Sequence, residues 1–247
     1  MQHQFDYNYD LARKLGLRDF ARFKTARSGA EVPVTIWSHD VVVRKGTPDI
    51  LVAVHSLTGE FKALRGLLPD DFDGVIVDAG GYIGTATLAL RKLYPKARII
   101  VLEPSEANLM VLRQNLAGVE NVQIVHGALV GKERASITLL DPGKGEHAFT
   151  AVERPKTNEN AAAMHEAPAY TLSQLVEDGS EIGILKLDIE GGEVDVLEHD
   201  METLRGIKAV FAELHDRIND GCTRLFTEFS QGRVVVRIGE KRLSVKP

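Results

Sequence analysis

From residue 75 onward, short apolar runs alternate with segments whose apolar residues recur at helical spacing. The apolar runs predict buried strands at Val75–Val77, Arg98–Leu102, Val122–Val125, Ile184–Leu187 and Ala209–Leu214. Helices are expected over Thr85–Tyr94 and, behind a Ser105 cap, up to Leu116. Strands that alternate with helices predict an α/β fold, with a doubly wound, mostly parallel sheet covered by helices on both faces.

The two ends of the chain depart from this alternation. Val234–Ile238 and Arg242–Val245 flank a Gly239-Glu240-Lys241 turn and predict a hairpin, so the sheet is expected to end in an antiparallel edge strand. The N-terminal part is expected to contain a helical region at 6–27, short strands at Val32–Trp37 and Val41–Arg44, and a helix at Ile50–Leu67. We predict a single domain over residues 1–247, in which 1–70 form an extension that shapes the site and 71–247 form the core.

A long excursion separates the third and fourth predicted strands. Ala135–Leu140 and Phe149–Val152 resemble strands around a glycine-containing turn. Glu153–Pro168 is polar and is predicted to be a loop. A loop of this length is expected to be either a lid over a functional site or disordered.

Composition narrows the class of protein. Of the 247 residues, 44% are hydrophobic, which allows a substantial core. The net charge of −5 argues against a general electrostatic grip on nucleic acid. The single cysteine, Cys222, forms no internal disulfide and suits a reducing compartment. No apolar run approaches the ~18 residues of a membrane span, and the start lacks a signal segment. A cytoplasmic protein without a membrane or nucleic-acid partner is expected.

The first predicted strand leads into a glycine loop that is typical of nucleotide-binding βαβ units. An acid, Asp78, ends the strand, and Gly80, Gly81 and Gly84 precede the helix. A carboxylate here disfavours a dinucleotide diphosphate, and Ala79 stands where that fingerprint has glycine. The same carboxylate attracts a ligand that carries an ammonium, such as the amino-acid end of S-adenosylmethionine (SAM). The loop therefore predicts a SAM site rather than an NAD site.

The ends of the next two strands extend this predicted cofactor site. Glu103 ends the second strand, where one carboxylate can accept hydrogen bonds from both hydroxyls of a ribose. The alternative is a helix-start acid ahead of Pro104. His126 and Ala128 follow the third strand, where an adenine would rest. His126 is expected to stack on or bond to the base, or to be an ordinary loop histidine.

A second cluster of polar residues lies at the fourth and fifth strands. Lys186 and Asp188 alternate onto one face of the fourth strand, and Glu213 and His215 share one face of the fifth. A lysine inside a parallel strand needs a partner, and a Lys186–Glu213 pair is predicted. Asp188 and His215 then lie at the carboxyl ends of adjacent strands, where ligands bind in open α/β sheets.

Two more acids follow this strand and precede an apolar helix. Glu193 is expected to serve as a helix-start charge. Glu190 is expected either to do the same or to belong to the site.

Together these motifs resemble the FkbM-type family of SAM-dependent methyltransferases, over roughly residues 40 to 216. The matching motifs are Val77–Gly84, Glu103-Pro104, Thr171-Leu172, Leu185–Gly191 and Glu213–Asp216, preceded by Arg44–Asp49 and Gly59–Phe61. The resemblance implies a seven-stranded methyltransferase sheet with a reversed edge strand. It also implies O-methylation of sugars, natural products or other small molecules. The family usually has Ala-Asn where this chain has Gly81-Tyr82, and the Tyr82 ring is expected to cover the cofactor.

The prediction is a SAM-dependent O-methyltransferase with a small-molecule acceptor. SAM is expected to contact Asp78, Gly80, Gly81, Tyr82, Gly84, Glu103, His126 and Ala128. His215 is expected to be the general base, because imidazole titrates near pH 7, with Asp188 and Glu190 beside it. No metal ligand is assigned. One alternative is a metal-assisted enzyme in which Asp188, Glu190 and His215 bind Mg²⁺ or a similar ion. Another is a non-catalytic module that binds SAM or a sugar.

Overall fold

The computed structural model describes residues 2–140, 150–152, 164–177 and 179–247. Within them, seven strands form one sheet in the order β12-β13-β11-β10-β3-β4-β5. They are β3 (Val75–Ala79), β4 (Arg98–Glu103), β5 (Val122–His126), β10 (Ile182–Leu187), β11 (Ala209–Glu213), β12 (Val234–Ile238) and β13 (Lys241–Val245). The strands from β11 to β5 run parallel, and β13 pairs antiparallel with β11. The predicted fold class, including the reversed edge, is confirmed.

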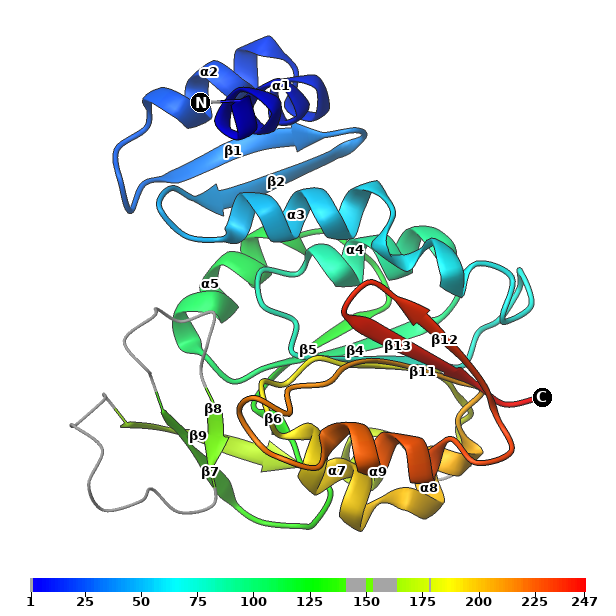
Figure 1. Ribbon diagram of the computed structural model, residues 1–247. Helices are drawn as coiled ribbons and strands as arrows, with labels where there is room; N and C mark the ends of the chain where they lie inside the picture. The colour runs from blue at the N-terminus through cyan, green and yellow to red at the C-terminus, as the bar shows by residue number, and fades with distance from the viewer. Residues whose placement is uncertain (1, 141–149, 153–163, 178) are drawn as a thin grey trace.

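Helices cover both faces of this sheet, as Figure 1 shows. One face carries α3 (Asp49–Thr58), the 3-10 helix η1 (Glu60–Leu64), α4 (Thr85–Leu93) and α5 (Glu106–Asn115). The other carries α6 (Leu172–Leu175), α7 (Glu193–His199), α8 (Met201–Gly206) and α9 (Cys222–Phe229). Successive strand residues point to opposite faces, so Ile76 packs in the first layer and Val77 in the second. The apolar runs are continuous because both faces are buried.

The N-terminal segment forms a layer above α3 and α5. It consists of α1 (Gln2–Leu15), α2 (Leu17–Thr25), β1 (Glu31–Ile36) and β2 (His39–Arg44), with β1 and β2 antiparallel. Asn115 at the end of α5 joins this layer to the core. Its Oδ1 accepts from the Val42 N–H at 2.6 Å, and its Nδ2 donates to the Ile83 carbonyl at 2.8 Å. The β1–β2 hairpin is thereby held beside the glycine loop.

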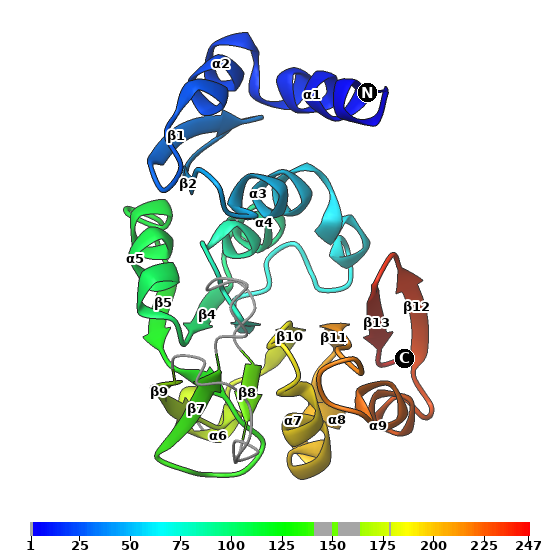
Figure 2. The same cartoon turned by 60° about the vertical axis from the view of Figure 1, so that its left-hand side comes forward.

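A second, smaller sheet lies at the opposite end of the molecule from the β12–β13 hairpin (Figure 2). Its order is β6-β9-β7-β8, from β6 (Ala128–Leu129), β7 (Ser136–Leu140), β8 (Thr150–Val152) and β9 (Met164–Tyr170). The predicted strands at β7 and β8 are present. The predicted lid at Glu153–Pro168 needs correction, because its last five residues lie in β9. The remainder, 153–163, falls outside the described residues.

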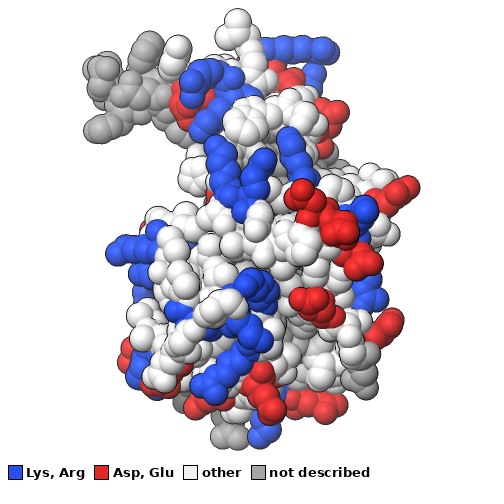
Figure 3. All heavy atoms as spheres, turned by 90° about the vertical axis from the view of Figure 1, so that its right-hand side faces the viewer, with Lys and Arg blue, Asp and Glu red and all other residues white. Residues whose placement is uncertain are grey.

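On the face that carries the β12–β13 hairpin, Lys and Arg side chains are intermixed with Asp and Glu (Figure 3). Although the net charge is −5, the acidic side chains on this face do not form a single continuous patch (Figure 3). Among the described residues, no helix is both long enough and apolar enough to cross a membrane.

Candidate active site

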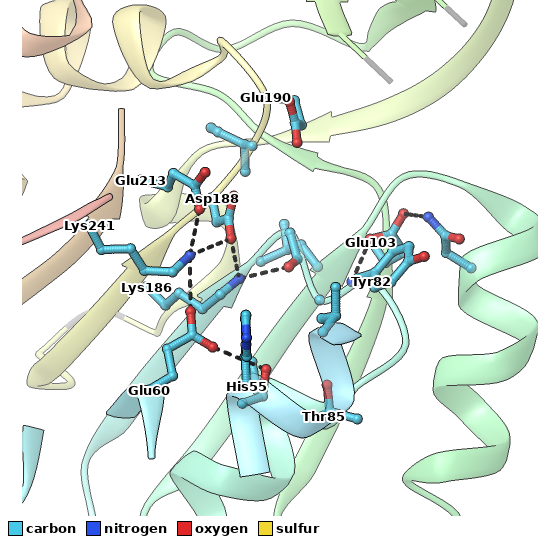
Figure 4. A pocket seen from close by; sticks show the side chains of 18 of the residues that line it. His55, Glu60, Tyr82, Thr85, Glu103, Lys186, Asp188, Glu190, Glu213 and Lys241 are labelled. Carbon is cyan, nitrogen blue, oxygen red and sulfur yellow. Dashed lines mark hydrogen bonds and ion pairs between the residues drawn. The ribbon is translucent and has the colours of Figure 1, made fainter. Parts of the chain in front are cut away.

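A pocket of about 840 Å³ opens at the carboxyl ends of the central strands. Ligand pockets typically measure roughly 300–1,000 Å³, so this one has room for a cofactor and an acceptor. Its walls come from the segments that follow β3, β4, β5, β10 and β11, from α3 and η1, and from the β12–β13 turn. Figure 4 shows acidic and basic side chains from these elements converging on one end.

The glycine loop after β3 is fixed by close contacts on both sides. Gly80 has a φ of 81°, and a Cβ there would lie 1.9 Å from the Asp188 carbonyl oxygen. A Cβ on Gly81 would lie 2.3 Å from Cγ2 of Val101. Both amides donate to the Leu102 carbonyl, at 3.1 and 2.8 Å. These glycines therefore allow the loop to pack between β4 and β10, along the floor of the pocket.

Glu103 lies at the pocket wall with both carboxylate oxygens hydrogen-bonded. Oε2 accepts from the Tyr82 amide at 2.7 Å. Oε1 accepts from the Ser105 amide at 3.0 Å and from Nδ2 of Asn108 at 3.2 Å. The residue is 5% exposed, and this burial raises the pKa of its carboxyl to about 7 despite the hydrogen bonds. Glu103 is thus held rigidly, as its predicted role requires.

Tyr82, within the glycine loop, is held in place by contacts with the N-terminal segment that the sequence does not predict. Its φ is 49°, its ring lies 5.6 Å from the Arg44 guanidinium, and its hydroxyl donates to the Asp49 carboxylate. Arg44 Nε donates to the same carboxylate at 2.9 Å. Burial and the Asp49 charge raise the pKa of the Tyr82 hydroxyl. The aromatic side chain is therefore fixed by the N-terminal segment, where the family motif has asparagine.

Asp78 lies beneath the pocket rather than on its wall. It is 0% exposed, accepts from Oγ1 of Thr87 at 2.7 Å, and lies 3.0 Å from the Lys186 ammonium. Lys186 also donates to the Gly80 carbonyl at 2.8 Å. The ammonium that Asp78 attracts is therefore one within the protein, and the pair supports the loop from below.

The predicted pair between Lys186 and Glu213 is wrong. The strand register sets Lys186 opposite Asp78 on β3 and opposite Phe211 on β11, so Glu213 lies two residues further along. Glu213 instead pairs with Lys241, whose ammonium lies 2.8 Å from its Oε2. The imidazole of His215 and the ammonium of Lys241 lower the pKa of Glu213 to about 2.

Lys241 and Glu60 are pocket residues that sequence reasoning missed. The Lys241 ammonium lies 3.0 Å from Oδ2 of Asp188 and 3.2 Å from Oε1 of Glu60, as well as beside Glu213. The three carboxylates outweigh burial and raise the pKa of Lys241. The sequence pattern predicts only that residue 241 lies in the turn of the C-terminal hairpin. No local pattern connects this residue with η1 or β10.

His215 is buried behind the pocket, and its surroundings change its predicted role. Nδ1 lies 2.9 Å from Oε1 of Glu193. Burial lowers the pKa of the imidazole, but the carboxylates of Glu193 and Glu213 outweigh it and raise the pKa to about 10. This pKa lies above the value near 7 that the predicted role as a general base assumes. His215 is 3% exposed, and it is not among the described residues that line the pocket.

Glu193 does more than supply a charge to the first turn of α7. It is 0% exposed and accepts from the amides of Ile189 and Gly191, both at 2.9 Å. It therefore shapes the loop that carries Asp188 and Glu190. Glu190 lines the pocket, has a φ of 49°, and lies with Oε2 3.7 Å from Nε2 of His215. Burial raises the pKa of the Glu190 carboxyl.

At the far end of the predicted cofactor site, Ala128 lines the pocket and the His126 side chain does not. Nε2 of His126 lies 3.1 Å from the Pro104 carbonyl oxygen. The structure thus brings Gly80, Gly81, Tyr82, Glu103 and Ala128 to one wall. It brings Asp188 and Glu190 to the other, and it leaves Asp78, Gly84, His126 and His215 outside the described lining.

Comparison with known proteins agrees with this architecture. The sequence model of the methyltransferase FkbM domain matches residues 78–235, more than half of the chain. Methyltransferase 1 of Beauveria bassiana (strain ARSEF 2860) is 32% identical over 175 residues, which cover 63% of this chain and 69% of that protein. Methyltransferase sdnD of Sordaria araneosa is 28% identical over 152 residues, and the chain spans 59% of its length.

Solved structures with similar folds are more distant. Precorrin-6y C5,15-methyltransferase from Geobacter metallireducens GS-15 has a TM-score of 0.42 and 15% identity, with 83% of this chain and 92% of that chain covered. A SAM dependent methyltransferase from Aquifex aeolicus has a TM-score of 0.41 and 12% identity, with 77% and 89% covered.

Proposed function

The chain belongs to the FkbM methyltransferase family, and on that premise we propose that it methylates a hydroxyl group of a small molecule. The observation that carries the proposal is the two-ended pocket. One end has the glycine loop and the Glu103 carboxylate, and the other has carboxylates that can accept hydrogen bonds from hydroxyls. The enzyme's principal task is to align the acceptor oxygen with the methyl group.

The residues at the first end fit SAM, which supplies an electrophilic methyl group when bound. Glu103 is buried and ionisable at the position where a ribose diol would donate, and its Oε2, which among the described hydrogen bonds accepts from the Tyr82 amide alone, keeps a lone pair for a ribose hydroxyl. Gly80 and Gly81 expose backbone beside Thr85 at the start of α4, where a carboxylate is stabilised by the helix N-terminus. Ala128 provides a small side chain where a flat base needs space.

The residues at the second end favour a neutral or cationic acceptor with hydroxyl groups. Asp188, Glu190, Glu213 and Glu60 all line the pocket, against the ammonium groups of Lys186 and Lys241. Apolar side chains from the other walls offer contacts to a carbon skeleton, namely Val52, Phe61, Ile137, Leu139 and Ile238. A phosphate or carboxylate on the acceptor would meet like charges there.

Within this proposal, Asp188 and Glu190 contact the acceptor and His215 is a positioning residue. Glu190 is the better proton acceptor of the two acids, because burial raises its pKa, whereas the ammonium groups of Lys186 and Lys241 lower the pKa of Asp188 despite burial. His215 orders the loop through Glu193 and lies 3.7 to 3.9 Å from both acids. This replaces the role of His215 as a neutral base.

The test is methyl transfer from SAM to a panel of hydroxyl-bearing small molecules, followed by mass spectrometry of the products. We expect a mass increase of one methyl group on a hydroxyl, absent when SAM is omitted. RNA and protein substrates form the comparison arm. Methylation confined to RNA or protein would contradict the small-molecule proposal. SAM binding without transfer to any acceptor class would favour a non-catalytic module.

A further inference from the structure

Three side chains of the second end point one donor atom each toward a common centre. Nε2 of His215 lies 3.9 Å from Oδ1 of Asp188 and 3.5 Å from Oε1 of Glu213. The donor atoms of all three residues lie within 4.8 Å of one another. Donors bound to one cation at about 2.0–2.3 Å are separated by comparable distances. The three side chains therefore need little movement to share an ion.

The orientation of the imidazole is set from behind. Glu193 accepts hydrogen bonds from two backbone amides, which hold its carboxyl group in place behind the imidazole. Nδ1 of His215 then carries the proton that is donated to Glu193, at 2.9 Å. A carboxylate that fixes the far nitrogen in this way is the usual support of a metal-bound histidine. It leaves Nε2 as the atom that faces Asp188 and Glu213.

Nε2 of His215 has no hydrogen-bond partner among the described residues, although 97% of the side chain is buried, since 3% is exposed. Oε2 of Glu190, 3.7 Å away, likewise has none in the described part of the chain. Buried polar atoms are rarely left in this state without a water or an ion. The unpartnered nitrogen, aimed at acidic oxygens, is a second observation that points to a bound cation.

Lys241 does not fill this position. Its ammonium contacts Oδ2 of Asp188 and Oε2 of Glu213, at 3.0 and 2.8 Å. The other oxygen of each carboxylate, Oδ1 and Oε1, is the one that faces His215. Each carboxylate thus directs one oxygen toward Lys241 and the other toward His215.

We propose that Asp188, Glu213 and His215 bind a divalent cation whose remaining positions face the pocket and take a hydroxyl of the acceptor. Mn²⁺ suits this donor set, because carboxylate ligands favour hard ions while the imidazole favours the transition metals. A cation there would polarise the acceptor oxygen and ease loss of its proton, with Glu190 beside it. This inference rests on the proposed function, since it names how that site treats its acceptor.

The experiment is a Mn²⁺ titration of protein stripped with EDTA, followed by electron paramagnetic resonance and calorimetry. We expect one Mn²⁺ per chain, and at least tenfold weaker binding in both Glu213→Gln and Asp188→Asn. Glu60→Gln is the matched control, because Glu60 also contacts Lys241, at 3.2 Å, but lies outside the three ligands. Its Mn²⁺ affinity should fall by much less than that of either ligand variant.

SAM calorimetry on the same samples checks that each variant is folded and separates the two proposals. Absence of stoichiometric Mn²⁺, Mg²⁺ and Zn²⁺ binding in a protein that binds SAM would overturn the cation site alone. A proton on Nε2 would then neutralise the cluster. Equal loss of Mn²⁺ binding in Glu60→Gln and Glu213→Gln would also overturn it, because the effect would then be a general loss of charge.

Discussion

At the scale of single residues, Glu103 reports most directly on the cofactor. Replacing it with glutamine removes the charge and keeps the shape. We expect SAM affinity to fall about tenfold to a hundredfold, since hydrogen bonds to a charged acceptor contribute roughly 1.5–3 kcal/mol. Calorimetry measures the change. Glu106→Gln is the control, an exposed acid at the start of α5 that should bind SAM normally. Equal affinity in Glu103→Gln and the control would remove Glu103 from the ribose site.

The raised pKa of Glu103 predicts how binding depends on pH. In the free protein its carboxyl is protonated below about 7, whereas an unfolded glutamate ionises near 4.5. Its contribution to stability is therefore greatest at low pH and is lost as the pH rises from the lower value to the higher. Ribose hydroxyls donate best to the ionised form, so SAM affinity should rise with pH up to about 7 and then level off. Calorimetry between pH 5.5 and 8.5 tests this, and Glu103→Gln should lose the rise.

Single residues also show which parts of the site can be predicted from residue types and which cannot. Glu103 and Asp188 were predicted because each ends a strand in a position that the parallel sheet defines. The partners of Lys186 were not predicted, because alternation gives the face of a side chain but not the register between strands. On β11 the residue opposite Lys186 is Phe211, two residues before Glu213, and the carboxylate that pairs with Lys186 is Asp78 on the other neighbouring strand, β3.

At the scale of elements, the loop between β3 and α4 can be tested at Gly80. We expect Gly80→Ala to abolish folding or SAM binding, because its Cβ would collide with the Asp188 carbonyl oxygen at 1.9 Å. Gly16→Ala is the matched control, with a φ of 76° and no described atom within 4 Å of the added Cβ. The control should lose only the backbone strain of an alanine at this φ and a ψ of 157°, roughly 1–3 kcal/mol. Similar melting temperatures in the two variants would show that backbone conformation alone explains the glycine.

Elements with continuous apolar patterns were predictable, and β9 was not. The strands of the large sheet are buried on both faces, which leaves a run of apolar residues in the sequence. Among the β9 residues whose burial is described, the fully buried ones are the small Ala167 and Ala169, and the strand contains Pro168. Because a proline argues against a strand, the sequence pattern predicts a loop for this segment.

At the scale of the whole molecule, Lys241 joins parts that are remote in the sequence. Glu60, Asp188 and Glu213 come from η1, the end of β10 and β11, and the C-terminal hairpin brings the ammonium between them. No local pattern carries such a convergence, because it depends on the order of strands in the sheet. The end of the pocket that we propose to bind the acceptor was therefore the part least predictable from sequence.

Lys241→Met should destabilise the protein strongly, because three carboxylates would lose their shared cation. Removing one partner of a buried ionic cluster costs roughly 3–5 kcal/mol, which in a chain of this size lowers the melting temperature by roughly 6–20 °C. Lys246→Met, an exposed lysine after the same strand, should change the melting temperature little. Calorimetric melting compares them. If the two variants melt alike, the cluster does not depend on Lys241.

The charge of the whole pocket also predicts which acceptors are used. The pocket lining includes the carboxylates of Glu60, Asp188, Glu190, Glu213 and Glu240 against the ammonium groups of Lys186 and Lys241, so in protein without a bound divalent cation an anionic group on the acceptor meets net repulsion. A single like-charge contact at ~4 Å costs roughly 1–4 kcal/mol, depending on the local dielectric. Paired acceptors that differ only in charge, such as a sugar and its phosphate or a methyl ester and its acid, measure this effect. We expect kcat/KM to be at least about fivefold lower for the anionic member of each pair when EDTA-treated protein is used.

Ionic strength separates this electrostatic selection from simple size exclusion. Added salt screens exposed charges more than buried ones. If the repulsion acts at the solvent-exposed mouth of the pocket, raising the salt concentration should reduce the difference in kcat/KM between charged and neutral acceptors. A difference set by size would stay constant. The Glu60→Gln variant should also reduce this difference in kcat/KM, because the substitution removes one carboxylate from the pocket wall and leaves Asp188, Glu190 and Glu213 unchanged. A preference for the anionic acceptor, at any salt concentration, would contradict the assignment of this end of the pocket to neutral or cationic hydroxyl compounds.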